Sequence, residues 1–331
     1  MPMNIGIIGA GNIAAWMAKT IGPMPEAASF AVASRDLKKA SAFAEEYGFQ
    51  KAYGSYEELV NDPDVDIVYI ATPHSHHFEH AKLCIEHGKH VLCEKAFTMN
   101  AAQAEELFAL AEKKSVLITE AIWTRYMPSR KVINDLLAEG IIGEVRTLTA
   151  NLCYRICQNE RLIRPELAGG ALLDVGIYPL NFALMHFGDD FQNISSTVLM
   201  TETGVDGQEC ITLTYPDGRF AVLTAGMYGE SDRHGVFYGS KGYMVVDNIN
   251  NPLAIDICGP DHQVMRHIDL PEQITGYEYE VLEMIGCIQK GEKECPSMPH
   301  EETLRVLRIM DGLREDWGLV YPQEMPATAQ K

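Results

Sequence analysis

This sequence has few basic residues, no long apolar run and no cysteine spacing typical of a metal site. Only 27 lysines and arginines offset 46 aspartates and glutamates, which gives a formal net charge of −19. So acidic a chain is a poor partner for nucleic acid or for an anionic membrane, and we predict neither. No apolar run approaches the roughly 20 residues of a membrane-spanning helix, so we expect no spanning segment.

Motifs that the sequence does not contain narrow the possible classes of protein further. The eight cysteines are scattered without zinc-ribbon spacing, which predicts reduced thiols in a cytoplasmic protein. The sequence contains neither the G-x-S-x-G turn of serine hydrolases nor a Walker loop, so neither class has support. A chain of 331 residues exceeds a comfortable single core, and two domains are therefore expected.

The first feature present is a glycine-rich turn at residues 9–14, with the sequence G-A-G-N-I-A. It follows a strand predicted over residues 4–8 and opens a predicted helix. Gly9 permits a tight turn, Gly11 lets the backbone approach a pyrophosphate, and Ala14 keeps the helix close to the sheet. A turn that only joins a strand to a helix is the structural alternative. The predicted dinucleotide contacts here are Gly9, Gly11, Asn12 and Ile13.

Ser34 and Arg35 follow the second predicted strand, at residues 30–33. A site selective for NAD usually has a carboxylate there for the ribose 2′-hydroxyl. A hydroxyl and a guanidinium suit a 2′-phosphate instead, and Asp36 is explained as a helix N-cap. We therefore predict NADP as the cofactor, with NAD left open; the structural alternative is an exposed arginine that begins a helix.

Four histidines crowd the segment after the strand predicted at residues 66–71. They raise the alternative of a metal site, since His76 and His80 share a helix face. No acidic or cysteine ligand stands at a recognised spacing, so we predict no metal. A loop at the end of a strand is instead a cofactor position. The predicted cofactor contacts in this segment are Thr72, Pro73, His74 and His77.

Glu94 and Lys95 stand side by side after a short apolar strand that begins at Val91. Buried charges are costly unless they are paired or functional, and ligands bind at the C-terminal ends of parallel strands. We predict that Lys95 is catalytic and that Glu94 contacts the cofactor. A surface Glu-Lys pair is the structural alternative.

The pattern of the chain changes at residues 120–125. Before it, alternating strands and helices predict an α/β Rossmann domain with a doubly wound parallel sheet, residues 1–122. After it, residues 123–331 predict an α+β substrate-binding and oligomerisation domain with a large, mainly antiparallel open sheet and two late helices, 278–289 and 301–316. A loose tail is expected at residues 327–331. The predicted strands of the second domain are 146–154, 194–201, 209–215, 220–227, 236–238, 243–247, 254–257 and 264–268.

One predicted helix interrupts the strand-rich half, at residues 169–179. Asp174 and Tyr178 are four residues apart and therefore share a face of this helix. A core tyrosine with an acid one turn away is the structural alternative.

Together these motifs resemble the glucose–fructose oxidoreductase/inositol dehydrogenase (Gfo/Idh/MocA) family along the whole chain. The resemblance rests on the glycine turn, on Ala-Thr-Pro at 71–73, on Cys-Glu-Lys at 93–95 and on residues 170–178. Ser34-Arg35, residues 120–125 and a tyrosine at 178, where many relatives carry histidine, are most similar to one branch. That branch holds the dimeric dihydrodiol dehydrogenases and the NADP-dependent D-xylose dehydrogenases.

The resemblance implies a catalytic lysine at Lys95, a catalytic tyrosine at Tyr178 and a supporting aspartate at Asp174. It also implies a homodimer, or a higher homo-oligomer, formed through the C-terminal sheet. Ala96 replaces the family's proline and His74 an asparagine, and these departures leave the substrate open. Further residues expected at the site are His77 and Arg161 near the cofactor, and Trp123, Tyr154 and Tyr277 as an aromatic wall for the substrate or as core packing.

The predicted chemistry is hydride transfer between a nicotinamide and a hydroxyl or carbonyl carbon of a sugar, polyol or cyclic diol. A tyrosine with its ordinary pKa of about 10 is a poor base at neutral pH, and a nearby ammonium favours the phenolate. Tyr178 is therefore predicted as acid and base, Lys95 as its electrostatic partner, and Asp174 as an orienting group. Two other classes stay open. One is a non-catalytic NADP(H)-binding regulatory protein, and the other is a glycosidase or lyase that uses retained NAD for transient oxidation.

Overall fold

The computed structural model describes residues 1–325, so the tail expected at 327–331 lies outside the described residues. The chain forms two compact units. The first comprises Met1–Tyr126 and Gln273–Arg308, and the second comprises Met127–Glu272 and the chain from Ile309 onward. The segment 273–308, which the sequence pattern grouped with the second half, thus packs with the first unit. Its helix α9 (Glu278–Lys290) has a buried apolar face that includes Val281, Met284 and Ile285.

A parallel six-stranded sheet forms the centre of the first unit, in the order β3-β2-β1-β4-β5-β6. Strands β1 and β4 are rich in isoleucine, and β4 is buried throughout, as expected for strands covered on both faces. The strand order reverses between β1 and β4, and ligands of such sheets bind at this switch point. The strands are β1 (Met3–Ile8), β2 (Ala27–Ala33), β3 (Lys51–Tyr53), β4 (Ile67–Ile70), β5 (His90–Glu94) and β6 (Ile118–Ala121).

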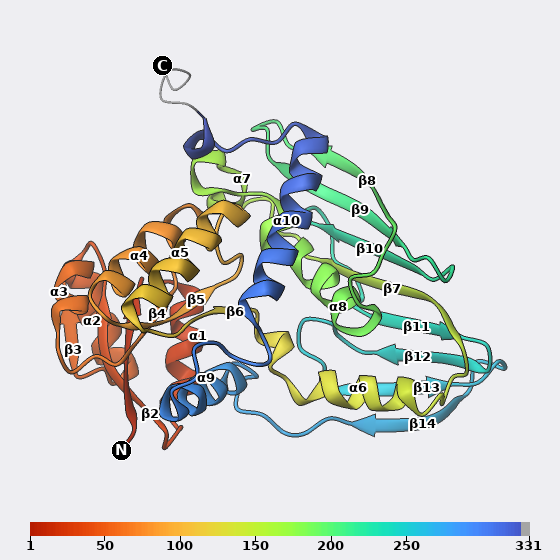
Figure 1. Ribbon diagram of the computed structural model, residues 1–331, viewed down its shortest axis with the longest axis horizontal. Coiled ribbons are helices and arrows are strands. Elements are labelled where there is room, and N and C mark those ends of the chain that lie inside the picture. The colour runs from red at the N-terminus through yellow and green to blue at the C-terminus, as the bar shows by residue number, and fades with distance from the viewer. Residues whose placement is uncertain (326–331) are drawn as a thin grey trace. The chain divides into compact units, whose positions relative to one another are not determined.

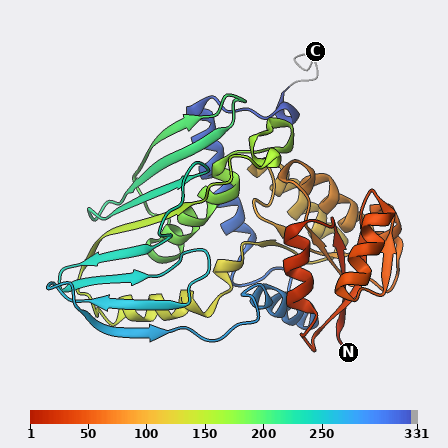
Figure 2. The same cartoon turned by 180° about the vertical axis from the view of Figure 1, so that it is seen from behind.

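Helices cover both faces of this sheet. Figure 1 shows α4 and α5 on its near side, and the view from behind in Figure 2 brings α1 to the front. Local capping fixes where several helices begin, because Asp36, Ser55 and Asn100 accept hydrogen bonds from first-turn amides. The remaining helical elements of this unit are α1 (Asn12–Ile21), α2 (Leu37–Tyr47), α3 (Tyr56–Asn61), η1 (His74–His76), α4 (His77–Glu86), α5 (Ala101–Lys114) and η2 (Trp123–Arg125).

An eight-stranded sheet forms the second unit, in the order β14-β13-β12-β11-β7-β10-β9-β8. Its pairs are antiparallel except β7–β10, which is parallel. In β7 and β8 every second residue is more exposed, which is typical of a sheet with one face against a core. The strands are β7 (Val145–Cys153), β8 (Asn193–Met200), β9 (Asp206–Thr214), β10 (Phe220–Gly226), β11 (Gly235–Gly239), β12 (Gly242–Val246), β13 (Ala254–Cys258) and β14 (Val264–Asp269).

Helices α6 (Pro128–Ala138) and α8 (Ile177–Phe187) lie against one side of this sheet in Figure 1. By length and composition, Pro165–Phe187 could cross a membrane, with a mean hydropathy of 1.4, but 94% of its apolar window is buried inside the protein. That burial is typical of a core helix. The other helical elements are α7 (Glu160–Ile163), η3 (Pro165–Leu167), η4 (Leu172–Gly176), η5 (Pro322–Glu324) and α10 (His300–Trp317), whose first part belongs to the first unit.

The predicted fold class is confirmed, and the departures from it are local. Strand β6 lies two residues later than the predicted 116–119, and α6 was not predicted. Residues 172–176 form a π-helical turn rather than part of one regular helix. Such turns are rare and often lie at functional sites, and this one leads directly to Tyr178.

Candidate active site

The glycine turn has the shape that a dinucleotide phosphate requires. Gly9 has φ +101°, and a Cβ on it would lie 2.7 Å from the Ala71 carbonyl oxygen, so only glycine fits there. A Cβ on Gly11 would meet nothing within 4 Å, which leaves the backbone open to a ligand. Gly11 begins α1 without a side-chain cap, and the first turn of α1 carries no acidic residue. These amides fit a phosphate, since a helix N-terminus favours an anion.

Ser34, Arg35 and Asp36 follow β2 at the same edge of the sheet. The Asp36 carboxylate accepts hydrogen bonds from the amides of Lys38 and Lys39, at 2.9 and 3.4 Å, which confirms the predicted N-cap. The Arg35 side chain is exposed, and its charge contributes to lowering the pKa of His76, after burial. The guanidinium therefore lies near the loop that follows β4. A cation at this edge fits a 2′-phosphate.

The histidine segment after β4 is a hydrogen-bonded cluster. Burial, and then the charges of neighbouring histidines and Arg35, lowers the pKa of His80 to about 4. The His80 Nδ1 lies 3.0 Å from the Thr72 hydroxyl, and the ring of His74 meets that of His77 edge-on at 5.7 Å. Across residues 1–325 no three His, Cys, Asp or Glu side chains are grouped to hold a metal ion.

Residues 95–97, called the Lys95 loop below, are held from three directions. The His77 ring places Nδ1 2.8 Å from the Ala96 carbonyl oxygen and Nε2 2.8 Å from that of Thr72. Glu120, at the end region of β6, accepts the Phe97 amide at 3.1 Å, and the Cys93 thiol lies 3.6 Å from the Phe97 carbonyl oxygen. The loop that presents Lys95 is therefore tied to α4, β5 and β6.

Buried acids surround the base of this loop. Glu94 is 6% exposed and accepts hydrogen bonds from the Tyr69 hydroxyl and from the Lys95 amide. Burial raises the pKa of Glu120 to about 7, and it raises the pKa of Glu280 well above its usual range, with the Glu94 charge adding to the effect. The Glu280 carboxyl has no hydrogen-bond partner within residues 1–325. Burial of this kind favours the protonated, neutral form of a carboxyl, because it avoids the cost of burying the charge.

Two of the three predicted aromatic residues lie together. The Trp123 and Tyr277 rings are stacked, with centroids 4.1 Å apart and planes inclined by 9°. Trp123 is buried and Tyr277 is half-buried, so the pair can form a wall for a ligand in this unit. Tyr154 belongs to the second unit, where its hydroxyl accepts from Asn250 at 3.3 Å and the Arg233 guanidinium lies 5.4 Å from its ring centre.

Residues 171–178 of the second unit, called the Tyr178 turn below, carry the remaining predicted site residues. The Asp174 carboxylate pairs with the Arg161 guanidinium at 3.1 Å, and it is largely buried while Arg161 is half-buried. Tyr178, in the first turn of α8, is 7% exposed. The structure thus brings Arg161 and Asp174 together, as side chains of one unit.

Two buried acids of β9 support the Tyr178 turn. Asp206 accepts the Leu172 amide at 2.5 Å, and a Cβ on Gly176 would collide with a Glu209 carboxyl oxygen. Burial raises the pKa of Asp206 to about 6 and that of Glu209 well above its usual range, where the Asp206 charge adds to it. Neither oxygen of Glu209 has a hydrogen-bond partner in the described part of the chain.

Sequence analysis missed the supporting role of Glu120, Glu280, Asp206 and Glu209. Each is an acid in β6, β9 or α9 with buried residues close to it in the same element. Glu280 lies in the helix predicted at 278–289 and Glu209 begins the strand predicted at 209–215, whereas Glu120 and Asp206 lie outside the predicted strands. Because acids are seldom fully buried, an acid on the inward face of an amphipathic pattern is the signal that identifies such residues.

Two comparisons place the whole chain among known proteins. A family described as oxidoreductases with an NAD-binding Rossmann fold matches residues 3–122, and a GFO/IDH/MocA C-terminal domain matches residues 131–245. The trans-1,2-dihydrobenzene-1,2-diol dehydrogenase of Xenopus tropicalis is 35% identical over 334 residues, which cover 97% of this chain and 100% of the relative. The human protein of that name is 33% identical over 335 residues, covering 98% and 99%.

Solved structures share the fold over almost the whole chain. A 3-ketoreductase from Actinomadura kijaniata, in complex with NADP and TDP-benzene, has a TM-score of 0.87 at 28% identity and covers 95% of this chain and 98% of its own. The aldose-aldose oxidoreductase of Caulobacter crescentus, complexed with glycerol, has a TM-score of 0.84 at 22% identity and covers 97% and 100%. Domain matches, full-length relatives and fold agree, and the chain belongs to the GFO/IDH/MocA family of NAD(P)-dependent oxidoreductases.

Proposed function

We propose that this protein is an NADP-dependent dehydrogenase of small cyclic diols and pyranose sugars. This proposal rests on the similarity, at 35% and 33% identity over nearly the full length, to dehydrogenases that are named for a cyclic trans-diol. The ketoreductase with the same fold was solved with NADP, which supports the choice of cofactor. Residues 1–122 would bind the cofactor, and residues 123–331 would supply substrate contacts.

Arg35 would select NADP by pairing with the 2′-phosphate, with Ser34 beside it. The phosphates would be held by the amides at Gly9, Gly11, Asn12 and Ile13. The nicotinamide half would lie near Thr72, Pro73, His74, His77, Glu94 and Arg161. Replacing Arg35 with alanine would then raise the KM for NADP by roughly tenfold or more, because a charge-assisted pair is lost. The KM for NAD would change little, and equal changes for both cofactors would contradict the assignment.

The proposed mechanism assigns proton transfer to Tyr178. When bound, the nicotinamide accepts or supplies the hydride. In the oxidative direction the Tyr178 phenolate oxygen takes the proton of the reacting hydroxyl, and in reduction the phenol returns it to the developing alkoxide. The Lys95 ammonium favours the phenolate and can donate to the reacting oxygen. Asp174, held by Arg161, orients a substrate hydroxyl, and the stacked Trp123 and Tyr277 rings cover an apolar face of the ring substrate.

A substrate panel tests the function. Trans-1,2-cyclohexanediol, D-xylose, D-glucose and an acyclic polyol are offered with NADP and with NAD, and reduced nicotinamide is followed by its absorbance. We expect NADP reduction with at least one cyclic substrate and weaker activity with the acyclic one. Cofactor binding without turnover would favour the regulatory alternative. A tightly retained cofactor with no net reduction would favour transient oxidation by a glycosidase or lyase.

We further propose a homodimer through the open face of the second unit's sheet. Phe220 and Tyr238 both pair with Thr147, so their exposed side chains share that face. Leu199 lies on it as well, since the β8–β9–β10 register places it on the Phe220 side. Exposed apolar side chains gathered on one face are typical of an interface. Light scattering that gives a monomer mass at working concentration would contradict this.

We also propose a cytoplasmic location. All eight cysteines are free thiols, which supports it.

A further inference from the structure

A cavity lies in the first unit, at the end of the sheet opposite to the Lys95 loop. Its volume is about 610 Å³, within the range of small-molecule sites. His90, which begins β5, and Leu117, just before β6, line it, whereas Lys95 follows the other end of β5. The rest of the wall comes from α5 and the residues just after it, and from the chain between the last turn of α9 and the first residue of α10. Nothing in the proposed dehydrogenase chemistry uses these residues.

The floor and the rim of this cavity differ in character. Phe108, Ala111, Val116 and Leu117 form a buried apolar floor. Three glutamates and one lysine stand among the exposed or half-buried lining residues, which leaves two uncompensated negative charges. The lysine, Lys293, is already 3.6 Å from Glu112, in an exposed pair of little energetic weight. A ligand with an apolar body and a positive charge complements this lining.

His300 fixes where the positive charge would bind. Its ring stacks on Phe108 with centroids 3.9 Å apart, and its Nε2 lies 3.0 Å from the Ile118 carbonyl oxygen. A carbonyl only accepts hydrogen bonds, so Nε2 carries the hydrogen in that contact. Burial lowers the pKa of His300, which favours the neutral ring and leaves a lone pair on Nδ1.

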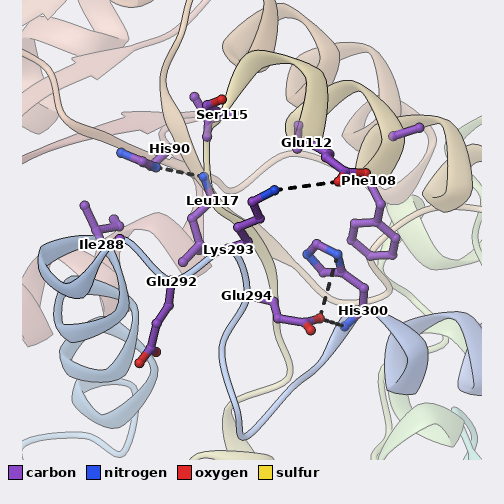
Figure 3. Close-up of a pocket in the computed structure, with 14 residues that line it drawn as sticks. His90, Phe108, Glu112, Ser115, Leu117, Ile288, Glu292, Lys293, Glu294 and His300 are labelled. Carbon is purple, nitrogen blue, oxygen red and sulfur yellow. Dashed lines mark hydrogen bonds and ion pairs between the residues drawn. The ribbon is translucent and has the colours of Figure 1, made fainter.

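Glu294 supplies a second acceptor beside that lone pair. Its carboxylate accepts the His300 backbone amide at 2.8 Å, and the same oxygen lies 3.8 Å from Nδ1, too far for a hydrogen bond. Figure 3 shows the Glu294 carboxylate next to the His300 ring, with Lys293 extended toward Glu112 and Glu292 directed elsewhere. Two acceptors thus flank one gap, and an N–H donor with a positive charge satisfies both.

We propose that this cavity binds a small organic ammonium ion, with the ammonium between Glu294 and His300 Nδ1 and the apolar body against the apolar floor. The absence of any group of three metal-ligating side chains within residues 1–325 favours an organic cation over a metal ion. The aromatic and aliphatic floor favours an apolar body over a polyamine. The site would be separate from the dehydrogenase site and independent of the proposed substrate.

The test compares two probes of one shape on the full-length protein. 2-Phenylethylamine carries the ammonium, and 2-phenylethanol replaces it by a neutral hydroxyl; titration calorimetry measures both. We expect the amine to bind more tightly than the alcohol. Glu294→Gln keeps an acceptor for the His300 amide but removes the charge, so the amine affinity should fall by roughly tenfold or more. Glu292→Gln removes the same charge from a neighbouring position and should leave the affinity within about twofold.

A blocking variant separates this cavity from any other binding site. Ala109 lines the cavity and is exposed on α5, so Ala109→Trp fills the space from a tolerant position. Binding of the amine should be lost in Ala109→Trp while its circular dichroism and NADP binding are kept. Equal affinities for amine and alcohol, equal effects of the two glutamine variants, or unchanged binding to Ala109→Trp would each overturn the proposal.

Discussion

The Lys95 loop and the Tyr178 turn both rest on buried acids, but they are supported in different ways. Three side chains from three elements hold the Lys95 loop, namely His77, Cys93 and Glu120. The first amides of the Tyr178 turn depend on one carboxylate, that of Asp206, while Glu209 packs against Gly176 and has no hydrogen-bond partner among residues 1–325. Support is therefore shared in the first unit and concentrated in the second.

This difference follows from the local backbone. The C-terminal ends of parallel strands β4, β5 and β6 converge, so side chains of neighbouring strands reach one loop. A π-helical turn instead interrupts the regular ladder of hydrogen bonds and needs outside partners for its amides. The two regions consequently differ in how much a single substitution should cost.

The largest expected effect is that of Asp206→Ala. The change leaves buried amides of the Tyr178 turn unpaired, and it should lower the free energy of unfolding by about 3–5 kcal/mol. Urea unfolding followed by circular dichroism measures this loss. Asp206→Asn keeps one acceptor oxygen and is the matched control, for which we expect a smaller loss. A loss below about 1 kcal/mol for Asp206→Ala would show that the support is shared here too.

A smaller effect is expected in the pH dependence of stability. The pKa of Asp206 rises from 3.8 to about 6, and that of Glu120 from 4.5 to about 7. Between the unfolded and folded values the folded state binds more protons, so stability should fall as pH rises through these windows, by at most about 3 kcal/mol per group. In a plot of the free energy of unfolding against pH, Asp206→Asn should flatten the part below about pH 6. Glu120→Gln should flatten the part that extends to about pH 7. An unchanged curve in both variants would refute the assignment of these protons.

The smallest expected effect is that of Cys93→Ala. Its thiol contact to Phe97 is weak, and His77 and Glu120 still hold the loop, so the free energy of unfolding should fall by only about 1 kcal/mol. Cys84→Ala removes an equally buried thiol from α4 and is the matched control. The two variants should have the same KM for NADP. A tenfold rise in KM for Cys93→Ala alone would show that the Lys95 loop depends on a single contact.

The sequence predicts elements well where period and turn signals agree. The glycine turn, α3 and the strands of the second unit follow from apolar alternation and from Gly, Asp and Asn signals, and α3 has the predicted bounds. The π-helical turn could not be predicted, because it depends on Asp206 and Glu209 from a strand more than thirty residues away. Likewise, the position of residues 273–308 depends on tertiary packing and not on local pattern.

The site was predicted as a set of residue types rather than as a set of contacts. The pairing of Arg161 with Asp174 and the stacking of Trp123 on Tyr277 bring together residues that the family resemblance named separately. The bridging position of His77 between the Thr72 and Ala96 carbonyls could not be inferred, since it requires two loops to lie on either side of one ring. The joint action of Lys95 and Tyr178 stays a prediction.

The pH dependence of kcat/KM, measured in the direction of alcohol oxidation, tests that joint action most directly. Tyr178→Phe should lose activity by roughly 10²–10⁴-fold, the usual worth of a general acid–base, whereas the exposed Tyr228→Phe should lose none. Lys95→Met should keep measurable activity but move the rise of the profile to higher pH, because the phenolate loses its cation. A Lys95→Met profile that is lower but unshifted, or full activity in Tyr178→Phe, would contradict the account.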